Sequence, residues 1–155
     1  MKKKKASQPR QITNRRAKFD YELGDSFVVG IALSGAETKA LRMGHGQLRG
    51  AYVNILSDEL WLVNATVNGT IGIPISEHDQ TRSRKLLAKR REIESLAAAK
   101  KQGRTIVPLE MLTHGRHIKV RIAIGKGKKQ YDKRQTLKAR DEARNISAAL
   151  KRHSR

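Results

Sequence analysis

Apolar positions in the middle of the chain recur with the spacing of short strands. Runs rich in β-branched residues predict strands at residues 27–33, 52–56, 60–67, 105–112 and 117–124. Turn residues Ser57 to Glu59 join the second and third runs into a hairpin. The Asn68-Gly69 pair is typical of a type I′ turn, so residues 70–75 are expected to return as another strand. Pro108 indicates an edge position or a bulge, because proline cannot donate to a strand ladder.

Two other segments have helical spacing. Ser34 and Glu37 match a capping box, which predicts a short helix through Leu41 that ends at Gly44. Residues 84–101 have the strongest helical pattern, with basic residues beside an apolar stripe and a glycine after the last turn. The stripe consists of Leu86, Leu87, Arg90, Ile93, Leu96 and Ala97.

Several short antiparallel strands with two inserted helices favour a mainly β fold. Strand edges need protection, and closing a sheet on itself removes them. We therefore expect a small closed antiparallel barrel of the oligonucleotide-binding (OB) type, with inserted helices and a basic C-terminal tail helix. An open, split sheet is the alternative arrangement.

Composition narrows the class of protein. The 155 residues leave room for one domain. The chain contains no cysteine, which excludes disulfide scaffolds, thiol nucleophiles and cysteine-ligated zinc, and which fits a reducing, cytoplasmic location. No apolar run approaches the roughly 20 residues that a membrane helix needs. Polar residues follow the lysines at positions 2–5, where a signal peptide is apolar, so we expect neither export nor a membrane partner.

Positive charge is concentrated at the two ends of the chain. The formal net charge is +20, and residues 1–18 hold eight basic side chains and no acidic one. Residues 126–155 hold eleven basic and three acidic side chains, so the two ends together carry +16. Self-repulsion disfavours packing of such ends into a core. We predict a basic N-terminal arm (1–18), a folded β-barrel domain (19–125) and a basic tail (126–155).

The tail has a weak helical pattern. Asp132 and Gln135 match an N-cap pair. A thin apolar stripe follows at Ala139, Ala143, Ile146 and Leu150. Isolated helices of this length are marginal in water, so we expect the tail to be disordered when free and to fold as a helix against an anionic partner. Most of the six aromatic residues are expected in the core, whereas Tyr131 lies among lysines and is suited to base stacking.

Sequence signatures of catalysis and of metal binding are missing. His114 and His117 have no third ligand or neighbouring glutamate, so we expect solvent-facing histidines and not a metal site. Residues 125–129 resemble a phosphate loop in composition, but they lack its spacing and the Ser or Thr that holds magnesium. We expect no enzymatic activity, no cofactor and no metal.

Clustered Lys and Arg favour a nucleic-acid partner, because they neutralise phosphates and release counterions. No recognition-helix, zinc-finger or basic-zipper pattern indicates readout of the DNA major groove. A small barrel with basic arms is better suited to an irregular RNA shape. The alternatives are a ribosomal-RNA-binding or ribosome-assembly protein, an RNA-processing enzyme and a polybasic protein of membrane surfaces.

Four motifs in collinear order carry a resemblance to a known family. They lie at residues 14–21 (NRRAKFDY), 30–42 (GIALSGAETKALR), 81–87 (TRSRKLL) and 127–134 (GKKQYDKR). The chain resembles the SmpB (small protein B) family, the SsrA-RNA-binding proteins of bacterial trans-translation. This resemblance implies an OB-type barrel that binds the tRNA-like domain of tmRNA (SsrA RNA) and delivers it to the empty A site of a stalled ribosome. It also implies that the tail becomes helical on the ribosome, where it occupies the mRNA channel and decoding centre as a substitute for codon and anticodon.

The resemblance also implies roles for individual residues. Positions that match the tmRNA-binding motifs are Asn14, Arg15, Arg16, Lys18, Glu37, Lys39, Arg42, Arg82, Arg84, Lys85 and Leu87. Positions that match the ribosome-binding tail are Lys126, Lys128, Lys129, Tyr131, Asp132, Lys133, Arg134, Lys138 and Arg140. The implied partners are tmRNA, the stalled ribosome, and elongation factor Tu with alanyl-tmRNA, with one protein monomer per tmRNA.

Three positions depart from the family pattern. Val28 stands where members commonly carry Glu, Gln80 replaces the Pro of a D-P-T-R motif, and Glu142 stands where many relatives have a bulky tail residue. The segment 68–78 is also shorter than the usual loop. RNA contacts at these positions are therefore not carried over. Glu37 has an equally strong structural explanation, since it completes the helix cap with Ser34.

Overall fold

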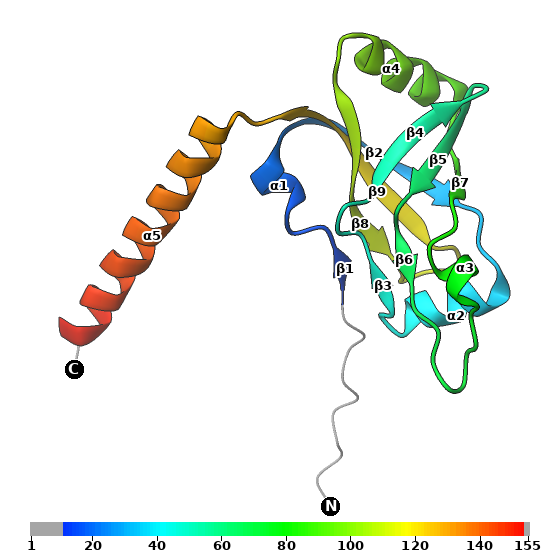
Figure 1. The fold of residues 1–155 in the computed structure, drawn as a ribbon, viewed down its shortest axis with the longest axis horizontal. Helices are drawn as coiled ribbons and strands as arrows, with labels where there is room; N and C mark the ends of the chain where they lie inside the picture. Colours follow the sequence, from blue (N-terminus) through cyan, green and yellow to red (C-terminus); the bar gives the residue numbers. More distant parts are fainter. Residues whose placement is uncertain (1–10, 154–155) are drawn as a thin grey trace, which may run out of the picture.

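The computed structural model describes residues 11–153, so residues 1–10 of the predicted N-terminal arm lie outside the described part. The strands are β1 (Ile12–Thr13), β2 (Tyr21–Ile31), β3 (Gly46–Gln47), β4 (Tyr52–Leu56), β5 (Glu59–Val63), β6 (Thr66–Val67), β7 (Arg84–Leu87), β8 (Thr105–Leu112) and β9 (Lys119–Gly127). The helices are α1 (Ala17–Asp20), α2 (Gly35–Arg42), α3 (Glu77–Gln80), α4 (Arg90–Lys101) and α5 (Gln130–His153). Figure 1 shows a sheet-rich body from which α5, in orange to red, extends away.

The main sheet is antiparallel. Seven strands are ordered β1-β8-β4-β5-β7-β2-β9, and β9 pairs in addition with β8. Strands β3 and β6 form a separate two-stranded ribbon. The expected class, a mainly β protein with inserted helices and a C-terminal helix, is confirmed.

The core is aliphatic. Its fully buried members, from β2, β5, β8, β9, α2 and α4, include Val29, Leu41, Leu60, Leu62, Leu96, Ile106 and Ile122. Burial of such side chains contributes roughly 1.5–3 kcal/mol each. The expectation that most aromatic residues lie in the core is wrong. Phe27 packs against the core only in part, and Tyr52 is 41% exposed.

Residues 84–87 form strand β7 and not the first turn of the predicted helix. This strand pairs with β5 on one side and with β2 on the other. Arg84 and Leu86 are buried, whereas Lys85 and Leu87 are at least partly exposed. The adjacent Leu86 and Leu87 are compatible both with the 3.6-residue spacing of a helix and with the two-residue alternation of a strand. The hydrophobic pattern alone therefore predicted a helix where the chain forms a strand. The helix is real but begins later, at the start of α4.

Two further expectations are wrong. The predicted strand 60–67 is interrupted at Asn64, whose φ of 60° is left-handed, a region that asparagine tolerates better than most residues. The chain changes partner there, because β5 pairs with β4 and β7 while β6 pairs with β3. Residues 70–75 form no strand, and only an isolated bridge joins Thr70 to Ile73.

Other predicted signals are confirmed. The Ser34 hydroxyl accepts a hydrogen bond from the Glu37 N–H (3.2 Å), and the Glu37 carboxylate accepts one from the Ser34 N–H (2.9 Å), which is the predicted capping box. Gly44 has a φ of 84° just after α2. The β8–β9 register shifts between Pro108 and Glu110, so the proline marks a bulge.

Helix α5 covers most of the predicted tail. It begins at Gln130, so Asp132 lies in the first turn and not at the N-cap. Ile146 and Leu150, from the apolar stripe, are exposed. The disorder of the free tail stays a prediction. No helix within residues 11–153 is long and apolar enough to cross a membrane.

Candidate RNA-binding surfaces

A buried ion network joins α2 to the segment that leads into β7. The Glu37 side chain is 1% exposed, and both of its carboxylate oxygens accept hydrogen bonds. Oε1 accepts from Arg82 Nε (2.8 Å) and from Arg84 Nε (2.9 Å). Oε2 accepts from Arg82 Nη2 (2.6 Å) and from the Ser34 N–H (2.9 Å). Two guanidinium groups thus compensate one interior carboxylate, which is what makes its burial tolerable.

Arg84 is fully buried and uses its other donors on main-chain carbonyls. Its Nη1 donates to the carbonyls of Ala65 (2.9 Å) and Arg82 (3.0 Å). Its Nη2 donates to those of Asp79 (2.9 Å) and Gln80 (3.1 Å). Together with the bond to the carboxylate, these contacts occupy all five N–H groups of the guanidinium. Arg84 therefore ties the end of α3 to β7 and has no donor left for a partner.

Charge in this network persists at neutral pH. Burial disfavours the Glu37 carboxylate, but the hydrogen bonds from Arg82 and Ser34 and the charge of Arg84 outweigh burial and hold the pKa of Glu37 below its ordinary value. The hydrogen bond to Glu37 raises the pKa of Arg82, whereas burial lowers the pKa of Arg84. Both arginines stay protonated, because the ordinary pKa of arginine is so high.

The outer face of β7, β2 and β9 presents cations around a leucine. Leu87 is 55% exposed and lies opposite Gly30 of β2, which also pairs with the exposed Lys119 of β9. Lys85 is partly exposed and forms an ion pair with Glu59 of β5. Sequence reasoning misses Lys119. The alternation of basic and apolar residues over Lys119, Val120, Arg121 and Ile122 is the sequence signal that could have identified it.

Besides Glu37, helix α2 carries two predicted residues with different surroundings. Lys39 is exposed. Arg42 is engaged, since its Nη1 donates to the carbonyls of Thr113 (3.1 Å) and Gly115 (3.0 Å) and its Nη2 to that of Arg116 (3.0 Å). Arg42 therefore fixes the β8–β9 loop against α2. The side chain of Arg116, in that loop, is exposed.

The segment 14–18 lies at β8 and α1, apart from α2 and β7. The Asn14 N–H donates to the Leu109 carbonyl (2.7 Å), and its side-chain Nδ2 donates to the Pro108 carbonyl (3.0 Å). The exposed cations of the segment are Arg15, Arg16 and Lys18. No hydrogen bond or ion pair within residues 11–153 joins it to α2 or β7. The predicted tmRNA-binding residues thus fall into two separate groups.

Helix α1 holds the start of the tail. The Lys128 N–H donates to the Asp20 carbonyl (2.9 Å), and Lys128 Nζ donates to the Lys18 carbonyl (3.0 Å). Asp20 Oδ1 lies 3.2 Å from Lys133 Nζ. We call residues 128–133 the tail root. Sequence reasoning assigned segment 14–18 and the tail to different surfaces, whereas the structure places Lys18 beside the tail root.

The remaining predicted tail residues are exposed to solvent. They are Lys126, Lys129, Tyr131, Asp132, Arg134, Lys138 and Arg140. Tyr131 is 68% exposed, and its hydroxyl accepts a hydrogen bond from Gln135 Nε2 (2.9 Å) one turn along the helix. Its ring is accessible for stacking.

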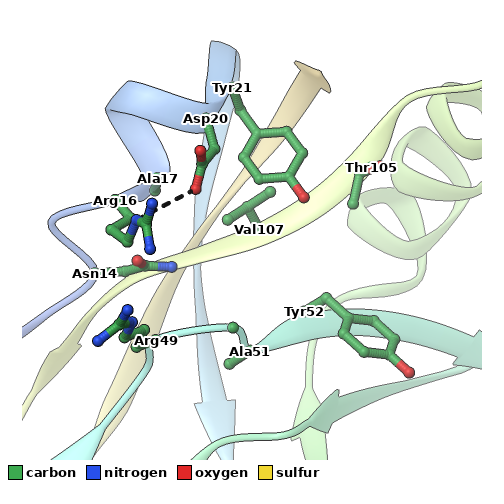
Figure 2. A pocket seen from close by; sticks show the side chains of 11 residues that line it. Asn14, Arg16, Ala17, Asp20, Tyr21, Arg49, Ala51, Tyr52, Thr105 and Val107 are labelled. Carbon is green, nitrogen blue, oxygen red and sulfur yellow. Dashed lines mark ion pairs between the residues drawn. The ribbon is translucent and has the colours of Figure 1, made fainter. Parts of the chain in front are cut away.

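A pocket of about 350 Å³ opens beside α1 (Figure 2). Its lining residues come from α1 and its flanks, the β3–β4 connection and β8; they are Asn14, Arg16, Ala17, Asp20, Tyr21, Arg49, Gly50, Ala51, Tyr52, Thr105 and Val107.

The two histidines of the HxxH pattern, His114 and His117, are exposed near the β8–β9 turn. Within the described residues, no group of three or more His, Cys, Asp or Glu side chains is placed to hold a metal ion.

Comparison with known proteins gives consistent matches. A family model described as SmpB protein matches residues 11–152. Relatives named SsrA-binding protein include that of Parvibaculum lavamentivorans, which is 45% identical over 154 residues, covering 96% of this chain and 93% of the relative. The relative from Protochlamydia amoebophila is 42% identical over 141 residues, covering 90% and 92%. A solved chain described as "tmRNA-SmpB: a journey to the center of the bacterial ribosome" is 34% identical with a TM-score of 0.63, covering 77% of this chain and 85% of that chain.

Proposed function

The chain belongs to the SmpB protein family, and we propose that it binds the tRNA-like domain of tmRNA (SsrA RNA) and delivers it to stalled ribosomes in trans-translation. The observation that carries this proposal is the division of exposed cations between an outer sheet face and a long basic tail helix. Each basic surface neutralises phosphates independently of the other. One protein can therefore hold tmRNA and the ribosome at the same time.

The tmRNA-binding surface consists of α2 and the outer face of β7, β2 and β9. Lys39, Lys85 and Lys119 supply positive charge, and Leu87 supplies an apolar contact for a ribose or a base. Glu37 and Arg84 act from the interior, where they hold the partly exposed Arg82 in place. Arg42 sets the neighbouring loop. The junction between the sheet and the tail carries the remaining predicted residues, Asn14, Arg15, Arg16 and Lys18. RNA bound to the outer sheet face or to the tail can contact them there.

The tail acts on the ribosome. The 24 residues of α5 give a helix about 36 Å long, which can follow the vacant mRNA channel. Lys129, Lys133 and Arg134 anchor phosphates near its start, and Lys138 and Arg140 continue the basic face. Tyr131 stacks on a base of the decoding centre. The helix thereby stands in for a codon and anticodon.

The remaining features of the proposal follow from the same resemblance. The ring of pairings β8-β4-β5-β7-β2-β9-β8 supports a closed barrel of the OB type. The protein acts in the cytoplasm as a monomer with one tmRNA, performs no catalysis and needs no cofactor. It works together with elongation factor Tu carrying alanyl-tmRNA.

Pull-down of the tagged protein with RNA sequencing tests this function. We expect tmRNA to be enriched far above ribosomal and transfer RNAs, and the protein to restore tag addition in a reconstituted reaction with ribosomes stalled on truncated mRNA. A ribosomal-RNA-binding or assembly protein predicts stoichiometric ribosome association without tmRNA enrichment. That result would overturn the proposal.

A further inference from the structure

Helix α4 and its flanks carry the net positive charge of the folded domain. Residues 89–104 hold six basic and two acidic side chains, whereas residues 19–88 and 105–125 together hold nine of each. The six basic residues are all exposed; they are Lys89, Arg90, Arg91, Lys100, Lys101 and Arg104. Neither the tmRNA-binding surface nor the tail includes any of them. Helix α4 is therefore a third basic surface of the molecule.

The inner face of α4 holds the helix on the body. Leu96 is fully buried and Ala99 is 7% exposed, and the helix packs on β8. Near its end, Lys100 Nζ donates a hydrogen bond to Asn54 Oδ1 of β4. The helix is thus fixed along its length, so the side chains of its outer face keep a defined spacing.

Both acidic side chains of α4 are engaged within the helix. Glu94 forms an ion pair with Arg90 (3.2 Å), and the Glu92 carboxylate accepts a hydrogen bond from the Lys89 N–H (2.8 Å). In the part of the chain that the structure describes, no hydrogen bond or ion pair engages the side chains of Arg91, Lys101 and Arg104. These three cations are therefore available to an anionic partner.

The available cations lie at the two ends of α4. Arg91 and Lys101 are ten residues apart, which is about 15 Å along the helix axis. Between them, Ser95 and Ala98 are exposed on the same face as Arg91, at i+4 and i+7, and both side chains are short. A charge-assisted hydrogen bond spans only about 2.7–2.9 Å, so one phosphate cannot contact both ends. The partner must present phosphates in two separate places.

A base-paired RNA segment fits this arrangement. Residues 89–104 contain no aromatic side chain, so α4 has no platform on which unpaired bases could stack. An RNA double helix has a wide, shallow minor groove that displays 2′-hydroxyls, with a phosphate backbone on each side. The short side chains of α4 allow close approach to the sugars. The Ser95 hydroxyl donates to the Arg91 carbonyl (3.0 Å) and keeps its oxygen as an acceptor for a 2′-hydroxyl.

The position of α4 favours the partner of the tail as the source of this RNA. Figure 1 shows α4 at the end of the body where the chain leaves for α5, with α2 at the opposite end. Thr105, just after α4, pairs with Gly125 of β9, and Arg104 and Lys126 line one pocket. The tail root follows directly after β9. A ribosome that holds the tail is therefore close to α4.

We propose that α4 lies across the minor groove of a base-paired segment of ribosomal RNA. Arg91 binds the phosphate backbone of one strand, and Lys101 and Arg104 bind that of the other. This contact holds the body on the ribosome beside the tail, separately from the surface that binds tmRNA. The inference rests on the proposed function for the presence of the ribosome, and on the spacing and charge of α4 for the contact itself.

Directed cleavage of RNA identifies the partner of α4. The chain has no cysteine, so an iron chelate that generates hydroxyl radicals can be attached at Gln102→Cys, just after α4, in the full-length protein. The labelled protein is bound with tmRNA to ribosomes stalled on truncated mRNA. We expect cuts in both strands of one ribosomal RNA helix. Cuts in tmRNA alone, or only in unpaired ribosomal RNA, would overturn the proposal.

A second chelate position distinguishes failure of this inference from failure of the proposed function. At Ser147→Cys in α5, the chelate should cut ribosomal RNA along the mRNA channel. Cuts from position 147 with none from position 102 would overturn the α4 contact and leave the proposed function standing. Cuts in a ribosomal RNA helix from position 102, by a protein that does not bind tmRNA, would uphold the α4 contact and reject the proposed function.

Matched variants test the phosphate contacts. Combined Arg91→Ala and Lys101→Ala should reduce the slope of log ribosome affinity against log salt concentration by about 2, because two phosphate contacts are lost. Affinity for the tRNA-like domain should not change. Combined Arg91→Lys and Lys101→Arg keeps both charges and should bind ribosomes like the wild type. Combined Arg49→Ala and Arg116→Ala removes two exposed cations outside α4 and should leave the slope unchanged. Equal reductions in the two alanine variants, or no reduction in the α4 variant, would show that α4 does not bind ribosomal RNA.

Discussion

Asp20 of α1 fixes Lys133 of α5, with 3.2 Å between Oδ1 and Nζ. The Asp20 carbonyl also accepts a hydrogen bond from the Lys128 N–H (2.9 Å), directly after the last β2–β9 pair, Tyr21 with Gly127. The tail root is therefore held by α1 as well as by the sheet. Both side chains of the ion pair are about one-third exposed, so the pair contributes about 0–1 kcal/mol to stability. We expect this ion pair to act instead on the direction of the tail.

Asp20→Asn should widen the range of tail directions and leave the fold intact. The chain has no cysteine, so spin labels can be placed at two introduced cysteines, Gln102→Cys and Ser147→Cys. We expect a broader distribution of distances between the labels in Asp20→Asn, with the free energy of unfolding changed by less than about 1 kcal/mol. Asp141→Asn, within α5, is the control. An unchanged distribution in Asp20→Asn would show that the ion pair does not orient the tail.

Truncation after Lys129 should separate the two RNA-binding surfaces. The cut removes α5 but keeps the last β2–β9 pairs, Glu22 with Lys126 and Tyr21 with Gly127. We expect a folded protein that retains most of its tmRNA affinity, because the outer face and α2 remain, and that fails to support tagging. Thermal unfolding, tmRNA binding and tagging on ribosomes with truncated mRNA are measured together. Tagging by the shortened protein would contradict the tail's role as codon substitute.

That truncation point shows where charge is a poor guide to structure. The charge pattern places the domain boundary at residue 125, yet β9 continues to Gly127. The chain pairs with β2 whatever the charge of Lys126, because main-chain hydrogen bonds do not depend on side-chain type. Hydrophobic patterning had the same limit at Leu86 and Leu87, where only the pairing of β7 with β5 and β2 decides between strand and helix.

The residues of the candidate RNA-binding surfaces could be predicted from sequence motifs, but the partners of their side chains could not. Arg84 looks like one more cation in a basic motif, and nothing in the sequence reveals that Glu37, 47 positions earlier, draws it into the interior. Arg42 similarly reads as a surface cation although three loop carbonyls accept its hydrogen bonds. The Ser34–Glu37 cap was predictable because its two residues are close in sequence. Long-range pairings carry no comparable local signal.

Glu37→Gln should remove part of the pH dependence of stability. The pKa of Glu37 lies below its ordinary value of 4.5, so the folded state favours the ionised form. Its contribution to stability is fully present above pH 4.5 and is lost as the pH falls through the folded-state pKa. We expect the variant to be less stable than the wild type at pH 7, with the gap in urea midpoint narrowing below pH 4.5. Glu94→Gln, on the exposed surface of α4, should track the wild type; a constant gap for Glu37→Gln would refute this linkage.

Affinity for tmRNA should fall steeply with salt. If the exposed cations neutralise about 6 to 10 phosphates, the affinity drops roughly 10³- to 10⁵-fold between 50 and 200 mM salt. Titration of labelled tRNA-like domain at several salt concentrations gives the slope. Lys119→Ala should reduce the slope of log affinity against log salt concentration by about 1, because one phosphate contact is lost. Lys101→Ala, at the end of α4, should leave the slope unchanged. An affinity that hardly changes with salt would contradict the electrostatic explanation. Equal affinity for duplex DNA would contradict recognition of the RNA's shape.

Tyr131→Ala should slow peptidyl transfer to tmRNA without weakening the binding of free tmRNA. The ring is 68% exposed, and its hydroxyl accepts a hydrogen bond from Gln135 of the same helix, so the β-sheet body loses no hydrogen bond when the ring is removed. Stacking of a base on an aromatic ring is worth about 1–3 kcal/mol. If that stacking is realised only in the accommodated state, transfer slows roughly 5- to 150-fold.

Two companion variants separate stacking on the ribosome from helix packing. Tyr131→His keeps a ring and should lose less activity than Tyr131→Ala, while Gln135→Ala removes the hydroxyl's partner and should leave transfer unchanged if only the ring matters. Single-turnover transfer on ribosomes with truncated mRNA is measured beside the affinity for free tmRNA. A Tyr131→Ala protein that transfers at the wild-type rate would exclude the stacking role. If Tyr131→Ala instead slows transfer only because it no longer binds free tmRNA, then Tyr131 belongs to the tmRNA-binding surface. A side chain that does not contact tmRNA before the ribosome is reached cannot weaken that complex.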